Sequence, residues 1–313
     1  MEKTTQANNF DCIIIGGGPA GVTAGIYATR AGLKTVIIEE MVVGGQASFT
    51  YEIDNYPGFS KISGMELGTK FAEHAENLGV EMVFDSITHM ELEGEQKTIE
   101  TAYSGTYTAK TAILCLGAKP RKLGLPNEEQ FIGKGLSFCA TCDGAFHAGK
   151  TVAVVGGGNS ALEEALFLAK TSEKVHLVHM LGEYQANHSM IQKVLNEPKI
   201  ECHLNSQVVE LHGQDMLSSI TIKNSQTNEI QEINLSGLFV AIGRVPSTEP
   251  VKEIVETDAQ GYIVSNEDMQ TNVAGVFVAG DVRQKKIRQI VTACSDGAIA
   301  AISANSYIIE NQK

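Results

Sequence analysis

The chain has 313 residues, of which 43% are hydrophobic and 19% are charged, so it can bury a sizeable core and is not a disordered chain. This length predicts two domains. The 37 Asp and Glu residues outnumber 24 Lys and Arg residues, and the net charge of −13 disfavours nucleic acid as a partner because acidic surfaces repel phosphates. Five of the basic residues are arginine: Arg30, Arg121, Arg244, Arg283 and Arg288.

The N-terminal segment, residues 1–10, is polar and lacks the apolar centre of a signal peptide. No stretch reaches the roughly 18 consecutive apolar residues that a membrane span requires. We therefore expect a cytoplasmic protein with no membrane partner. Six cysteines are too few for a disulfide-stabilised scaffold, and Cys12 and Cys115 lie in apolar runs that are typical of a core.

The same supersecondary pattern occurs twice. Residues 11–21 (DCIIIGGGPAG) and 151–161 (TVAVVGGGNSA) are each an apolar run that enters a triple glycine. A helical pattern follows each run and leads into another apolar strand, KTVIIEE in the first case and KVHLVHM in the second. Two copies of strand, glycine turn, helix and strand predict two nucleotide-binding domains of one architecture.

The first turn has the spacing of a dinucleotide-binding site. It follows a strand and opens a helix, so that backbone N–H groups and the positive end of the helix dipole can approach a pyrophosphate. An acid ends the next strand, 23 residues after the first glycine, where it is expected to bind an adenosine ribose hydroxyl. The predicted cofactor-binding residues of this region are Gly16, Gly18, Pro19, Ala20, Gly21 and Glu39.

The second turn has alanine in its last place, which the motif allows. The position that corresponds to Glu39 is a histidine, so this domain has a phosphate-binding turn without a ribose-binding carboxylate. The turn either binds a dinucleotide or is retained as a folding element with weak or no dinucleotide affinity. The residues predicted for this second site are Gly156, Gly158, Asn159, Ser160, Ala161 and His179.

Three further apolar runs, at 111–118, 237–244 and 275–281, are typical of buried strands, and a helical pattern at 287–309 closes the chain. The strand at 275–281 needs an existing sheet to join, because the last segment is too short to form one. We therefore predict an α/β protein with two doubly wound Rossmann-like nucleotide-binding domains, the second inserted into the first. The first domain is expected at 1–118 and 247–313, and the inserted domain at 119–246.

Cys139 and Cys142 form a CxxC that is followed directly by Asp143. A zinc knuckle would need a second cysteine pair at matching spacing, and the sequence has none. Two unrelated cysteines would not explain the acid beside the thiol. The pattern favours a redox dithiol, in which one thiolate attacks a partner disulfide, the other resolves the mixed disulfide, and the acid protonates the departing thiolate.

Six segments together resemble the low-molecular-weight thioredoxin reductase family. They occur in order along nearly the whole chain, and they are GGGPAG (16–21), GGQ (44–46), DNYPG (54–58), CATCDG (139–144), GGGNSALEEA (156–165) and a last segment of GVFVAGD, Arg288-Gln289 and Ala293 (275–293). The resemblance implies a homodimer, FAD in the first domain and a nicotinamide dinucleotide in the second, which also carries the redox-active cysteines.

Positions within these segments imply roles for single residues. Cys142 corresponds to the sulfur that faces the flavin, Cys139 to the nucleophile that attacks thioredoxin, and Asp143 to the general acid/base. Asp281 corresponds to a residue that hydrogen-bonds the ribityl–phosphate region of the flavin. The residues that correspond to flavin contacts are Gly45, Gln46, Asn55, Asp281, Arg288 and Gln289.

The sequence departs from this family at the expected NADPH site. The family has HRRxxxR there, and its arginines clamp the 2′-phosphate. In this chain residues 179–185 are HMLGEYQ, so that His179 remains, all three arginines are absent and Glu183 would repel a phosphate. The donor is then NADH held with modest affinity, or a reduced protein such as ferredoxin, as in some relatives of clostridial type. NADPH held by other contacts is the remaining alternative.

The leading hypothesis is a flavoprotein disulfide reductase, in which electrons pass from the donor to FAD, to the Cys139–Cys142 disulfide and on to a thioredoxin-like protein. A flavin-dependent dithiol oxidase, which passes electrons from a small dithiol to oxygen, is the alternative, since such relatives also lack the arginine clamp. An FAD-binding redox sensor is a third hypothesis, and the intact CxxC with its Asp143 argues against it.

Overall fold

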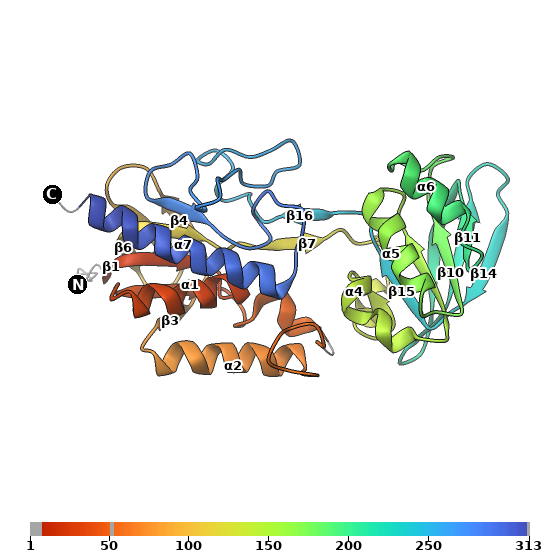
Figure 1. Cartoon of the computed structure of the whole chain (residues 1–313), viewed down its shortest axis with the longest axis horizontal. Coiled ribbons are helices and arrows are strands. Elements are labelled where there is room, and N and C mark those ends of the chain that lie inside the picture. Colours follow the sequence, from red (N-terminus) through yellow and green to blue (C-terminus); the bar gives the residue numbers. More distant parts are fainter. Residues whose placement is uncertain (1–7, 51–52, 312–313) are drawn as a thin grey trace. The chain divides into compact units, whose positions relative to one another are not determined.

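The computed structural model describes residues 8–50 and 53–311 (Figure 1). Most of the N-terminal segment, on which the expectation of no signal peptide rests, lies outside these residues. The chain divides into two compact units, of which the first comprises the residues up to Lys119 and from Val245 onward and the second Pro120–Arg244. The two crossing segments, β7 (Ala118–Pro120) and β16 (Arg244–Pro246), pair with each other.

The first unit is built on a seven-stranded sheet in the order β3-β2-β1-β6-β5-β4, with β17 also paired to β6. Its strands are β1 (Asn8–Ile15), β2 (Thr35–Glu39), β3 (Glu81–Phe84), β4 (Ile87–Glu91), β5 (Lys97–Thr101), β6 (Thr106–Leu114) and β17 (Val276–Val278). Its helices are α1 (Pro19–Arg30), the 3₁₀ helix η1 (Gly45–Phe49), α2 (Gly64–Asn77) and α7 (Ile290–Glu310).

The strands from β3 to β6 in this order, together with β17, run parallel, while β5 pairs antiparallel with both β4 and β6. The apolar run at 275–281 therefore joins the first unit's sheet, as predicted from the short C-terminal segment. On one face, Ile14, Ile37 and Phe277 pack against α1 and α7, which lie side by side (Figure 1). On the other face, Ile13 and Val278 belong to a core cluster with Val251, Val255 and Ile263.

The second unit has a five-stranded parallel sheet in the order β11-β10-β9-β15-β8 and a three-stranded antiparallel sheet, β12-β13-β14. Its strands are β8 (Leu136–Ser137), β9 (Thr151–Val155), β10 (Lys174–Val178), β11 (Ile200–His203), β12 (Ser206–Gly213), β13 (Leu217–Asn224), β14 (Ile230–Asn234) and β15 (Gly237–Val240). Its helices are α3 (Glu128–Phe131), α4 (Ala140–Asp143), η2 (Gly144–His147), α5 (Asn159–Ala169) and α6 (His188–Leu195).

The five-stranded sheet of the second unit is covered on both faces. Leu177 and Val154 pack against α5 and α6, whereas Val178 and Ala153 pack toward the three-stranded sheet. The central strands β9 and β15 are buried on both faces and are therefore almost entirely apolar, whereas the edge strand β11 alternates apolar and polar residues. The predicted α/β class with parallel sheets is confirmed.

Two predicted core cysteines are confirmed, since Cys12 is 0% and Cys115 is 7% exposed. None of the helices in residues 8–50 and 53–311 combines the length and the apolar character of a membrane span.

Close helix packing in the first unit depends on glycine. A Cβ on Gly297 of α7 would lie 2.1 Å from the carbonyl oxygen of Ala20, and one on Gly280 would lie 2.9 Å from the Ala20 side chain. Backbone atoms cannot give way as the end of a side chain can. The start of α1 is therefore held against α7 and the loop after β17 by positions that have no side chain.

We expect Gly297→Ala to destabilise the first unit by about 1–3 kcal/mol through overpacking against α1. Helix propensity alone favours alanine by ~1 kcal/mol, so a net loss of stability shows that the contact dominates. Chemical denaturation measures this difference, and Ser306→Ala on an exposed position of the same helix is the control. A Gly297→Ala protein as stable as the wild type would contradict the packing argument.

Candidate active site

The first glycine turn leaves room for a phosphate. Gly16 has φ of 104°, and a Cβ there would lie 2.4 Å from the carbonyl oxygen of Cys115, so only glycine fits. Gly18 has no heavy atom within 4 Å of an added Cβ beyond its chain neighbours, so open space adjoins it. No side chain among the described residues caps α1, whose first N–H groups are available to an anion.

Glu39 lies over this turn at the end of β2. Its carboxylate accepts hydrogen bonds from the N–H groups of Gly17 at 2.6 Å and Met41 at 2.8 Å. The acid that the spacing predicts is thus brought to the glycine turn by the parallel pairing of β1 with β2. A carboxylate in this place suits a ribose diol next to the pyrophosphate.

Two other predicted segments converge on the same turn. The Gly44 N–H donates to the carbonyl oxygen of Gly17 at 2.8 Å, and a Cβ on Gly45 would lie 3.2 Å from the Cα of Gly18. Gln46 follows in η1. Asp281 comes directly after Gly280, whose contact with Ala20 places it at the start of α1.

The remaining predicted flavin residues interact with one another. Asn55 Nδ2 donates to Gln289 Oε1 at 3.3 Å, and the Gln289 N–H, expected near the flavin ring, donates to Thr292 Oγ1 at 3.1 Å in the capping box of α7. Arg288 lies 4.0 Å from the centre of the Tyr262 ring and donates to the carbonyl oxygen of Asp281 at 3.3 Å. Arg288 therefore braces the loop that carries Asp281.

A buried acid that the sequence reasoning missed supports this loop. Asp296 of α7 is 5% exposed, and it accepts from the Gly280 N–H at 3.1 Å and from Lys285 Nζ at 2.8 Å. Arg283 approaches the same carboxylate at 3.4 Å. The available signal was an acid in the interior of a helix whose other interior residues are uncharged, since a buried charge needs such partners.

The CxxC forms a disulfide between Cys139 and Cys142, and both cysteines are partly exposed. Cys139 is the N-cap of α4, and its Sγ accepts from the Cys142 N–H at 3.2 Å. An N–H directed at sulfur stabilises a thiolate, so this contact favours Cys139 as the nucleophile once the disulfide is reduced. Ser137, which the sequence reasoning also missed, donates to Asp143 Oδ2 at 2.5 Å and accepts from the Cys139 N–H at 3.1 Å.

The second glycine turn differs from the first at the strand end. A Cβ on Gly157 would lie 2.2 Å from the His179 ring, which stacks on Tyr184 with the ring centroids 5.7 Å apart. Burial lowers the pKa of His179, so the ring is neutral, and its Nε2 is buried with no hydrogen-bond partner among the described residues. His179 thus packs over the middle glycine as Glu39 does over Gly17, without offering a carboxylate.

Comparisons with known proteins identify the family. A family model described as pyridine nucleotide-disulphide oxidoreductase matches residues 10–297. This chain belongs to the pyridine nucleotide-disulphide oxidoreductase family. It is therefore an oxidoreductase, and its Cys139–Cys142 disulfide and two Rossmann-like units are those of the low-molecular-weight thioredoxin reductase type.

Several members of this family are similar over nearly the whole chain. A protein named thioredoxin reductase from Peptoclostridium acidaminophilum is 43% identical over 311 residues, which cover 97% of this chain and 98% of the relative. The solved thioredoxin reductase from Streptococcus pyogenes is 40% identical with a TM-score of 0.91, covering 97% of this chain and all of that one. A ferredoxin-flavin thioredoxin reductase from Clostridium acetobutylicum is 29% identical with a TM-score of 0.54, covering 98% of this chain and 100% of that chain.

Glu164 is a half-buried acid in the second Rossmann-like unit. It lies on α5, and its Oε2 is buried with no partner among the described residues. Burial raises the pKa of Glu164 to about 7, against the opposing effects of Arg244 and of the backbone N–H of Ala140 between the two cysteines. The carboxyl group of Glu164, which contacts the Ala140 N–H, therefore changes its protonation state near neutral pH.

We expect Glu164→Gln to remove the part of the pH dependence of the free energy of unfolding that the titration of Glu164 causes. The folded state raises the pKa of Glu164 from 4.5 to about 7, so its stabilising contribution is present below pH 4.5 and is lost as the pH rises through 7. The thermal unfolding temperature of the wild type should therefore fall between pH 5 and pH 8 more steeply than that of the variant.

The matched control is Glu163→Gln, which removes the same charge from the exposed neighbouring position. Calorimetry at several pH values should give Glu163→Gln the slope of the wild type. Equal slopes for all three proteins would show that Glu164 is not the group that titrates.

Proposed function

We propose that this oxidoreductase is a flavin-dependent disulfide reductase that reduces a thioredoxin-like protein. One observation carries the proposal: the partly exposed Cys139–Cys142 disulfide adjoins Asp143, which Ser137 holds, in a chain similar to proteins named thioredoxin reductase. A redox pair that exchanges electrons with another protein must be reachable and must have a proton source beside it.

The first unit has the features that FAD requires. Backbone N–H groups at the start of α1, between Gly16 and Gly21, would bind the pyrophosphate, and Glu39 would bind the ribose. Gly45, Gln46, Asn55, Asp281, Arg288 and Gln289 would border the rest of the cofactor. When bound, FAD supplies the electron pair that reduces the disulfide.

The residues of the second unit then carry the exchange. The Cys139 thiolate attacks one sulfur of the partner disulfide, which forms a mixed disulfide and expels a thiolate. Asp143 donates the proton that the expelled thiolate takes up. Cys142 next attacks Cys139, which releases the partner as a dithiol and restores the Cys139–Cys142 disulfide, so that two electrons have moved to the partner.

We also propose that the electron donor is not NADPH held by an arginine clamp. His179 fills the strand-end position above Gly157, and no Lys or Arg occurs between Lys174 and Lys193. NADH or reduced ferredoxin is the donor that we propose, and the similar Clostridium acetobutylicum protein is described as a ferredoxin-flavin thioredoxin reductase.

We also propose that the protein is a homodimer, and sedimentation measures its mass in solution.

Replacing Cys142 with serine is expected to lower the rate of thioredoxin reduction roughly 100-fold or more, since the resolving sulfur is lost. The assay follows thioredoxin dithiol formation with each donor under anaerobic conditions. Cys202→Ser, which removes a free thiol of the second unit, is the control and should keep the wild-type rate. A Cys142→Ser enzyme with full activity would sink the assignment.

Oxygen consumption, measured with the wild-type enzyme, distinguishes a reductase from a dithiol oxidase. A reductase consumes little oxygen without a donor and transfers electrons to thioredoxin. An oxidase would consume oxygen stoichiometrically with a small dithiol and ignore thioredoxin.

Restoring the three arginines tests the donor. Met180→Arg, Leu181→Arg and Gln185→Arg together place guanidinium groups at exposed positions, where they should not disturb the core. We expect the preference for NADPH over NADH, measured as anaerobic bleaching of the flavin, to rise at least about tenfold because arginine binds phosphate bidentately. Rapid bleaching of the wild type by micromolar NADPH would show that the clamp is not needed.

A further inference from the structure

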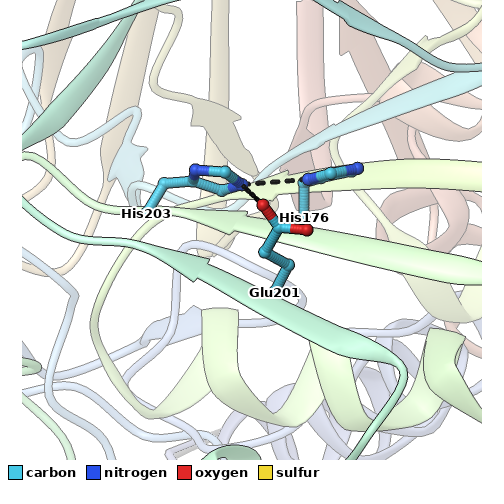
Figure 2. A group of neighbouring side chains, drawn as sticks. All are labelled: His176, Glu201 and His203. Carbon is cyan, nitrogen blue, oxygen red and sulfur yellow. Dashed lines mark hydrogen bonds and ion pairs between the residues drawn. The ribbon is translucent and has the colours of Figure 1, made fainter. Parts of the chain in front are cut away.

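A cluster of two histidines and one glutamate lies on the five-stranded sheet of the second unit, on the pair of strands β10 and β11. His176 is on β10, and Glu201 and His203 are on β11 (Figure 2). The parallel register pairs His176 with Glu201 and Val178 with His203. Because side chains alternate along a strand, the three residues share the face that Val178 turns toward the three-stranded sheet.

The potential ligand atoms are already close together. His176 Nδ1 lies 2.9 Å from His203 Nε2, and His203 Nε2 lies 3.5 Å from Glu201 Oε1. All three ligand atoms lie within 4.8 Å of one another. Ligands around tetrahedral zinc, with bonds of about 2.0–2.1 Å, lie about 3.3–3.4 Å apart, so a small movement of the two rings would admit the ion.

We propose that His176, Glu201 and His203 form a site for a divalent metal ion of the zinc class. Two imidazole nitrogens and one carboxylate are a ligand set that binds zinc and leaves a fourth position for water. Without the ion, one imidazole donates its N–H to the other. As the ion binds, that proton moves to the second nitrogen of the same ring, and no oxidant or reductant is involved.

The surroundings of the cluster favour this use. Glu201 Oε2 pairs with Lys174, which orients the carboxylate so that Oε1 faces His203 and the ion. Glu201 is 43% exposed and offers an entry path, whereas His203 is only 10% exposed.

The site is separate from the cysteines. Cys202 lies between Glu201 and His203 on β11, so its side chain points to the opposite face, where it packs with the core beneath α5 and α6. An ion bound by the cluster would join β10 to β11 beside the glycine turn, because the His179 N–H donates to the carbonyl oxygen of His203 at 2.9 Å. Its role would be to stabilise this edge of the second unit.

The test is equilibrium dialysis of the holoenzyme against zinc, with the Cys139–Cys142 pair kept oxidised so that no dithiol competes. We expect one zinc per chain, and X-ray absorption should show nitrogen and oxygen ligands at about 2.0–2.1 Å with no sulfur at about 2.3 Å. Absence of bound zinc, or a sulfur shell, would overturn the proposal.

Two variants locate the site. His203→Gln should weaken binding roughly 100-fold or more, since losing an outer partner of a ligand already costs 10–100-fold. His212→Gln is the matched control, because His212 also lies 3.5 Å from a carboxylate, that of Glu210, but belongs to no cluster of three possible metal ligands among the residues that the structure describes. Equal zinc affinity in His203→Gln and wild type would exclude the cluster. Should His203→Gln not fold, the ligand shell of the wild type decides the question alone.

Discussion

The close approach of a helix to the end of a strand is the constraint on which the first unit depends. A Cβ on Gly21 would lie 1.8 Å from the carbonyl oxygen of Gly16, so α1 can begin this near β1 only because residue 21 has no side chain. The same closeness lets Gly280 and Gly297 bring the loop after β17 and helix α7 against Ala20. Segments that are distant in sequence therefore meet at one set of backbone N–H groups.

In the second unit, the last position of the glycine turn is Ala161, whose methyl group packs against Gly156. A Cβ on Gly156 would lie 2.8 Å from the side chain of Ala161 and 2.4 Å from the carbonyl oxygen of Ala241, so glycine is required at the first position while alanine fills the last. Gly156 has φ of 146°, a conformation that residues with side chains rarely adopt. The turn is thus maintained by packing and by backbone hydrogen bonds, such as that from the Gln185 N–H to the carbonyl oxygen of Gly157 at 2.8 Å, whether or not a dinucleotide binds to it.

Sequence patterns predicted the features that depend on local periodicity. The α/β class, the strand at 275–281 and the CxxC disulfide were accessible because apolar runs, glycine turns and short spacings are contiguous in the chain. Asp296, Ser137 and the cluster around His203 were not, because their partners are set by tertiary packing and strand register. A one-residue shift between β10 and β11 would place His176 opposite a different residue and dissolve the cluster.

The residues at the two strand ends, Glu39 and His179, pack alike but differ in the groups that they can bind. Glu39 and His179 both lie over the middle glycine of their turns, so either side chain satisfies the packing, but only the carboxylate has two oxygens that can accept from both hydroxyls of a ribose. A pyrophosphate is bound by backbone N–H groups, which every strand–glycine–helix unit supplies. A 2′-phosphate would lie beyond the strand end, where a planar guanidinium suits it well. On our proposal, the absence of arginine at residues 180, 181 and 185 therefore bears on the 2′-phosphate, whereas the packing of the glycine turn does not depend on these positions.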